Sequence, residues 1–152
     1  MTGLFRSAGG VPKLPVERAR VGVEGMEGDH QRNRRFHGGP NRALCLYSLE
    51  LLHHLADEGH PVAPGTMGEN VTISGLDWAA LTPGVRLAIG EVEAEVTGYA
   101  APCEQIAGSF ADRAFKRVGQ KVNPGWSRVY VKILRTGNLA VGDRVQLQGA
   151  ET

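Results

Sequence analysis

The sequence predicts a mainly β fold with two or three short helices (α+β), built as a barrel or a strongly bent sheet. Short runs in which apolar and polar residues alternate predict strands, and glycine and proline separate these runs. Only two segments have helical periodicity, and many short strands with few helices are typical of barrels. The 152 residues, 41% of them hydrophobic, suffice for a single domain over 1–152 with its core at about 16–148.

Alternation of apolar and polar residues identifies the strands. It is clearest in 16–23, where Ala19, Val21 and Val23 alternate with arginine and glycine, and in 91–99, where apolar residues alternate with three glutamates. These patterns and the shorter apolar runs predict strands at 16–23, 43–47, 70–73, 85–89, 91–99, 129–134 and 145–147.

Two helices are expected. Ser48 is a typical N-cap residue, and the leucines after it recur at helical spacing, so the first helix runs to about Asp57. The second helix begins at Glu104 or Ser109 and continues to Val118.

The net charge of +1 hides a segregation of charge along the chain. Residues 1–42 carry eight Lys/Arg against four acids, 43–100 carry one against eight, and 101–152 carry eight against four. If the two basic segments converge they form a pocket for an anion, whereas separate solvated faces are the alternative. There is no domain-wide basic excess or aromatic interleaving for nucleic acid, and no membrane span or secretion signal. We therefore expect a cytoplasmic protein.

The two cysteines are too few for a disulfide scaffold, and their surroundings differ. Cys103 follows Pro102 between a predicted strand end and a predicted helix start, where the unpaired N–H groups of a helix N-terminus favour the thiolate. The alternative is an inert, buried thiol, as most free cysteines are. Cys45 lies in an apolar strand, so we expect it to pack in the core.

A long loop, 24–42, is the second candidate site, because loops beyond about 12 to 15 residues in a compact domain are usually functional or disordered. Its arginines and adjacent glycines suit a phosphate or oxyanion, and an exposed basic loop explains them equally well. Glu69 and Asn70, which follow a glycine, either line a site or form a turn. The sequence assigns no functional role to four histidines, His30, His53, His54 and His60.

Several segments together carry a resemblance that is more specific than any one of them. They are Gly28-Asp29, His37-Gly38-Gly39, Arg42-Ala43, Leu46-Tyr47, Pro64-Gly65, Gly68-Glu69-Asn70, Pro102-Cys103, the run Gly125 to Val131, Gly137, and the run Val141 to Val145. In this order they resemble the MOSC family, the domain at the C-terminus of molybdenum cofactor sulfurases, which also occurs as small standalone bacterial proteins. The resemblance spans roughly 16–148.

This resemblance implies a MOSC-type β-barrel that is associated with the molybdenum cofactor (molybdopterin) and acts through Cys103, which carries sulfur as a persulfide or ligates molybdenum. It also implies that Arg35 and Arg42 contact a pterin phosphate. The implied cofactor-binding residues are Arg35, His37, Gly38, Gly39, Arg42, Glu69 and Asn70. Family members that reduce N-hydroxylated compounds include further domains or partner proteins. Any flavin, iron–sulfur cluster or pyridoxal phosphate would therefore belong to a partner, such as a redox protein or a cysteine desulfurase.

Two classes of function remain open on the sequence. In the first, the chain is a sulfur transferase or a component of a molybdenum-dependent oxidoreductase. In the second, it is a noncatalytic barrel that binds a small anion or a partner protein, and Cys103 is inert. The sequence does not identify the substrate, the partner or the oligomeric state.

Overall fold

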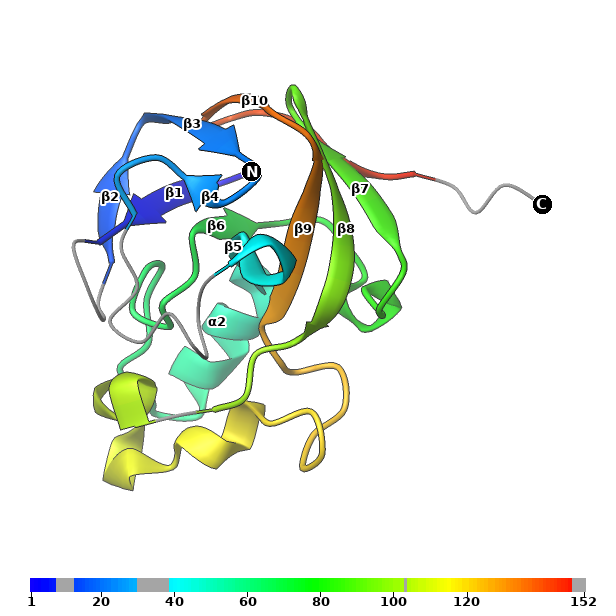
Figure 1. Cartoon of the computed structure of the whole chain (residues 1–152). Coiled ribbons are helices and arrows are strands. Elements are labelled where there is room, and N and C mark those ends of the chain that lie inside the picture. The colour runs from blue at the N-terminus through cyan, green and yellow to red at the C-terminus, as the bar shows by residue number, and fades with distance from the viewer. Residues whose placement is uncertain (8–12, 30–38, 103, 149–152) are drawn as a thin grey trace.

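Strands dominate the computed structural model, which describes residues 1–7, 13–29, 39–102 and 104–148 (Figure 1). The larger sheet contains, from edge to edge, β11 (Val145–Leu147), β7 (Arg86–Ile89), β8 (Val92–Tyr99), β9 (Val129–Arg135), β5 (Leu44–Ser48), β6 (Val71–Ile73), β1 (Gly3–Arg6) and β2 (Leu14–Val16). The smaller sheet contains β10 (Gly137–Ala140), β3 (Arg18–Gly22) and β4 (Gly25–Met26). The mainly β class is confirmed.

The larger sheet is open in the described residues. Its edge strands, β11 and β2, are not paired with each other, so the predicted closure into a barrel is not confirmed. One pair of strands was also not expected. β5 and β6 are parallel, and α2 (Leu49–Asp57) connects them in a β–α–β unit, whereas the other pairings are antiparallel.

The first predicted helix, α2, is confirmed together with its cap. The backbone N–H of Leu51 donates to Ser48 Oγ at 3.2 Å, which satisfies one of the amides that a helix N-terminus leaves unpaired. Leu52 and Leu55, two of the leucines at helical spacing, are buried, while His53 and His54 are exposed. None of the helices that the structure describes has the length and apolarity needed to cross a membrane.

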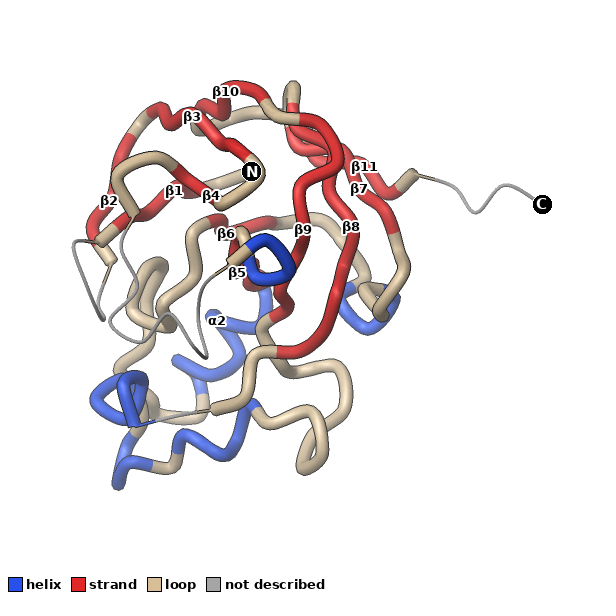
Figure 2. The backbone as a smooth tube through the Cα atoms, viewed as in Figure 1, coloured by secondary structure: helices blue, strands red, loops and turns tan. Residues whose placement is uncertain are grey.

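The prediction of a second helix is wrong. Three 3-10 segments, η3 (Glu104–Ser109), η4 (Ala111–Arg113) and η5 (Phe115–Val118), take its place at one end of the molecule (Figure 2). Phe110 is extended, and Asp112 has a φ of 54°, so the backbone leaves the helical region twice. Packing of the apolar side chains of Ile106, Phe110 and Val118 into the core accompanies this broken path.

The core begins earlier than residue 16. β1 lies between β6 and β2, and Leu4 is fully buried, although the sequence suggests a loose start. The strand was missed because four residues, Gly-Leu-Phe-Arg, are too few to display a period. Three other short strands, β2, β4 and β10, were missed as well.

Candidate functional site

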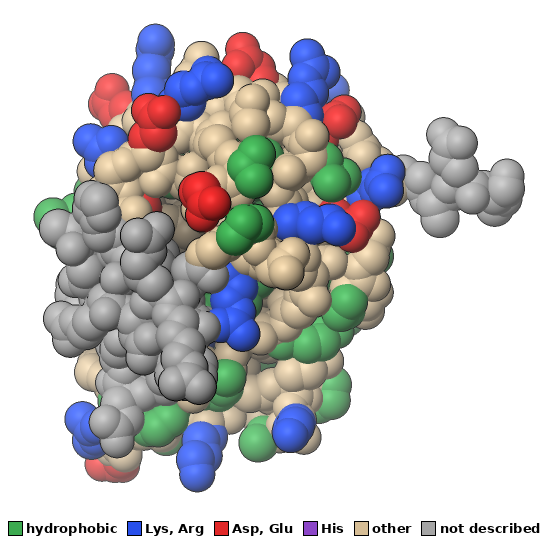
Figure 3. Space-filling model, in the orientation of Figure 1, with side chains coloured by type: hydrophobic (Ala, Val, Ile, Leu, Met, Phe, Trp, Pro, Cys, Tyr) green, Lys and Arg blue, Asp and Glu red, His purple; other side chains and the backbone are tan. Residues whose placement is uncertain are grey.

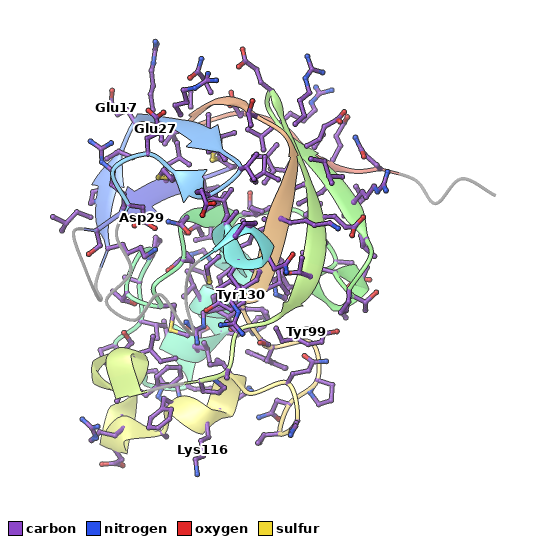
Figure 4. All side chains as sticks on the ribbon, in the orientation of Figure 1. Glu17, Glu27, Asp29, Tyr99, Lys116 and Tyr130 are labelled. Carbon is purple, nitrogen blue, oxygen red and sulfur yellow. The ribbon has the colours of Figure 1, made fainter. Side chains whose placement is uncertain are left out.

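A buried polar network begins at Asp29, the residue that completes the Gly28-Asp29 motif. Asp29 Oδ2 accepts a hydrogen bond from Lys13 Nζ at 2.8 Å, and the two side chains are 4% and 3% exposed. The same oxygen accepts from Asn70 Nδ2 at 2.8 Å, and Oδ1 accepts from the backbone N–H of Ser7. Figure 4 shows Asp29 beside the strands of the N-terminal half. The start of the long loop is therefore held against Asn70.

Asn70 extends this network to two strands of the larger sheet. Its Oδ1 accepts from the backbone N–H of Cys45 at 3.0 Å, and its Nδ2 also donates to the carbonyl of Phe5 at 3.3 Å. Its own backbone N–H donates to the carbonyl of Cys45 at 2.7 Å. The amide uses both its donor and its acceptor, so it joins β5, β1 and Asp29 at one buried point.

Glu69 lies in the interior, with no exposed surface. Thr72 Oγ1 donates to its Oε2 at 3.0 Å, while Oε1 has no hydrogen-bond partner among the described residues. Burial raises the pKa of Glu69, and the backbone amides of Gly65 and Glu69, the Thr72 hydroxyl and the charge of Arg128 act in the opposite direction. The carboxyl of Glu69 therefore tends towards its neutral form.

Arg128 connects the Gly68-Glu69-Asn70 motif to the segment that leads to Cys103. Its side chain is buried, with the residue 3% exposed. Nη1 donates to the carbonyl of Met67 at 2.9 Å, and Nη2 donates to the carbonyl of Ala101 at 3.1 Å. Met67 directly precedes Gly68, and Ala101 stands two positions before Cys103.

Arg42 lines an open groove of about 520 Å³ together with residues of β8 and β9. Its backbone N–H donates to the carbonyl of Gly39 at 3.0 Å, which places Gly39 beside this residue. Gly39 has a φ of 91° at the start of η1 (Pro40–Arg42), a conformation that favours glycine. The guanidinium carbon of Arg42 lies 5.6 Å from the ring centroid of Tyr130, within cation–π range. Tyr99 and Tyr130, labelled in Figure 4, both line this groove.

Cys45 packs in the core, as the sequence predicts. Burial raises the pKa of its thiol to about 11, although the charges of Arg128 and Lys13 lower it. These two cations come from the two basic segments of the chain, so one member of each segment lies close enough to lower the pKa of the Cys45 thiol. At the surface, Figure 3 shows Lys/Arg and Asp/Glu interspersed over the coloured part of the visible face.

Four of the predicted site residues, Arg35, His37, Gly38 and Cys103, lie outside the described residues, as does His30, so their roles remain predictions. The described residues include no cluster of three or more His, Cys, Asp or Glu side chains that would hold a metal ion. Of the others, Glu69 and Asn70 are brought together with Asp29 and Lys13 in the interior, and Gly39 and Arg42 lie near the groove.

Sequence reasoning missed Lys13, Arg128 and Tyr130. The network partners of the first two are distant along the chain, since Lys13 is 16 positions from Asp29 and Arg128 is 61 positions from Met67. Arg128 does occur within the run Gly125 to Val131 that the resemblance uses. The usable signal was an arginine placed directly before an apolar strand.

Comparisons with known proteins identify the family and support the fold. The family model described as MOSC domain matches residues 33–146, which is most of the chain. The chain belongs to the MOSC domain family. Two curated relatives resemble this MOSC domain in sequence. The uncharacterized protein YflK of Bacillus subtilis (strain 168) is 28% identical over 142 residues, and protein YiiM of Escherichia coli (strain K12) is 36% identical over 102 residues.

These matches cover 91% and 63% of the chain, and they span only 62% and 45% of the two relatives. Solved structures show the same fold. YiiM of Escherichia coli superposes with a TM-score of 0.73 over 99% of this chain and 69% of that one, at 22% identity. The YUAD protein of Bacillus subtilis superposes with a TM-score of 0.70 over 98% and 94% of the two chains, at 19% identity.

Proposed function

We propose that this MOSC domain is a molybdenum-cofactor-associated domain in which Cys103 carries sulfur as a persulfide or ligates molybdenum. One observation supports this most strongly. Hydrogen bonds join Asp29 to Asn70, and Arg128 to both Met67 and Ala101. The motifs that the resemblance assigns to one site are therefore adjacent at their described ends, although they are far apart in the sequence.

The described residues near the groove fit an anionic, partly planar cofactor. Arg42 supplies a cation, and a Cβ placed on Gly39 would meet no atom of the described residues within 4 Å, which leaves room there for a ligand beside this backbone. Together with Arg35, His37 and Gly38 they would hold the pterin phosphate, and the metal centre would supply the redox chemistry. Glu69 and Asn70 are almost completely buried, at 0% and 1% exposed, so a ligand in the groove would not contact them. Their role in the proposal is to support the segments that form the site.

Sulfur transfer is the simpler of the two modes. The Cys103 thiolate attacks the terminal sulfur of a persulfide donor, a new S–S bond forms at Cys103, and the donor thiolate leaves with the electron pair of the broken S–S bond. In the other mode Cys103 would ligate molybdenum, and the domain would support reduction of N-hydroxylated compounds with electrons from a partner redox protein. A reducing compartment such as the cytoplasm suits both modes, because it keeps the cysteines as thiols.

Sulfur loading of matched cysteine variants tests the proposal. Wild type, Cys103→Ser and Cys45→Ser are incubated with a persulfide donor, and the mass of each intact chain is measured. We expect wild type and C45S to gain one sulfur atom and C103S to gain none. If C103S gains as much sulfur as wild type does, Cys103 is not the sulfur carrier, and this mode of the proposal is wrong.

Titration of the Cys103 thiol separates the proposal from the noncatalytic alternative. A Cys103 pKa below the free-cysteine value of about 8.5 supports a reactive thiolate. A value at or above it favours a domain that only binds an anion or a partner protein. C103S supplies the background signal for this titration, because Cys45 stays a buried thiol in both proteins.

A further inference from the structure

Arg128 is a buried cation whose presence stability does not explain. No carboxylate of the described residues lies at ion-pair distance from it, since the ion pairs there involve other cations. Its Nε is buried and has no hydrogen-bond partner in the part of the chain that the structure describes. A guanidinium is always protonated in proteins, and burying an unpaired charge is strongly unfavourable.

Three buried titratable groups, Glu69, Tyr47 and Cys45, interact electrostatically with Arg128. None of them forms an ion pair with it among the described residues. Burial raises the pKa of all three, so each of them is pushed towards its neutral form. An apolar side chain of similar volume would avoid the desolvation of this charge. The reason for an arginine here must therefore lie in what its hydrogen bonds hold.

Both hydrogen bonds of Arg128 end at the described edges of the candidate site. One reaches the carbonyl of Met67, next to Gly68-Glu69-Asn70, and the other reaches the carbonyl of Ala101, next to Pro102-Cys103. The planar guanidinium presents its N–H groups in a fixed fork, so two acceptors on separate segments are held in one geometry.

We propose that Arg128 is a positioning residue for Cys103. Its side chain fixes the Ala101–Pro102 segment against the Met67–Gly68 segment. The inference rests on the proposed function of Cys103, because it gives a reason to hold this segment rigidly. Loss of the side chain should loosen the segment without unfolding the domain. The backbone N–H of Ala100 still donates to the carbonyl of Arg128 at 2.9 Å, and Ser127 Oγ donates to the carbonyl of Ala100 at 3.3 Å.

The test compares Arg128→Met, Arg128→Lys and a surface control, Arg86→Met, in the full chain. Arg86 is an exposed arginine on β7 that pairs with Glu95. Hydrogen exchange of the peptide that contains 99–106 reports on the segment itself and needs no cofactor. We expect R128M to speed the exchange of this peptide by about tenfold or more relative to the rest of the chain, because the carbonyls of Met67 and Ala101 lose their donor. R86M should match wild type.

Sulfur loading of Cys103 is the second readout. R128M should load about tenfold more slowly, since a small misplacement of a reacting group is costly, and R128K should recover part of the rate. A merely structural role predicts instead faster exchange throughout the chain, with no separate effect on 99–106 or on loading. Unchanged exchange of 99–106 in R128M overturns the inference. If R128M does not fold, wild-type exchange and loading in R128K overturn it.

The two proposals fail in different ways. If wild type and C103S load sulfur and bind molybdenum cofactor alike, the function proposed for Cys103 is wrong, and the exchange of 99–106 still decides whether Arg128 holds the segment. If C103S abolishes loading while R128M loads and exchanges as wild type does, only the role of Arg128 is wrong.

Discussion

Glu69 sets a pH dependence at the scale of a single residue. Its carboxyl is fully buried and accepts a hydrogen bond from Thr72, and its pKa in the folded chain lies above the ordinary 4.5. As pH rises past 4.5 the unfolded chain releases this proton while the folded chain retains it. The stability contributed by the neutral carboxyl is therefore present below 4.5 and lost as pH rises through the folded pKa.

Glu69→Gln should remove this loss, because glutamine resembles the neutral acid and does not ionise. We expect the free energy of unfolding of wild type to fall, relative to that of E69Q, as pH rises from 4.5 towards neutrality. Urea unfolding across this pH range measures the difference. The exposed control Glu17→Gln should follow wild type. An E69Q protein that loses stability relative to wild type as pH rises would show that the ionised carboxylate is the favoured form.

At the scale of secondary-structure elements, the short strand β1 connects the larger sheet to the polar network. It pairs with both β6 and β2, and the carbonyl of Phe5 accepts from Asn70. This strand of four residues therefore joins the edge strand β2 to the rest of the larger sheet and supplies one acceptor of the polar network.

Leu4→Ala tests whether β1 belongs to the core. Leu4 is fully buried, so the variant should lose about 2–5 kcal/mol of unfolding free energy through lost burial and the cavity left behind. Leu14→Ala on the neighbouring β2 is the matched control, because Leu14 is 67% exposed and its loss should cost less than about 0.5 kcal/mol. Chemical denaturation gives both values, and equal losses in the two variants would contradict this position of β1.

The sequence predicts those elements whose residues repeat a clear local pattern. Alternation predicts β8 and β9, and the Ser48 cap with the leucines after it predicts α2. The segment 104–118 misled because its apolar residues recur at near-helical spacing, while contacts with the core determine its broken path. Local patterns do not register such distant contacts.

At the scale of the whole molecule, the candidate site is an assembly of distant segments. The motifs of the resemblance are visible in the sequence, but the side chains that join them are not, because Asn70 is 41 positions from Asp29 and Ala101 is 27 positions from Arg128. Burial of Lys13 and Arg128 also runs against the usual exposure of charged residues, so no pattern of polarity would place them inside.

The central claim is that Cys103 is the reactive centre of a molybdenum-cofactor-associated domain. Its most direct test is the molybdenum and sulfur content of wild type, C103S and C45S, purified from a host that makes the cofactor and measured by metal analysis with intact-mass spectrometry. We predict that wild type and C45S carry molybdenum or one additional sulfur atom and that C103S carries neither. Wild type with neither of them, or C103S with as much of both as wild type, would contradict the claim.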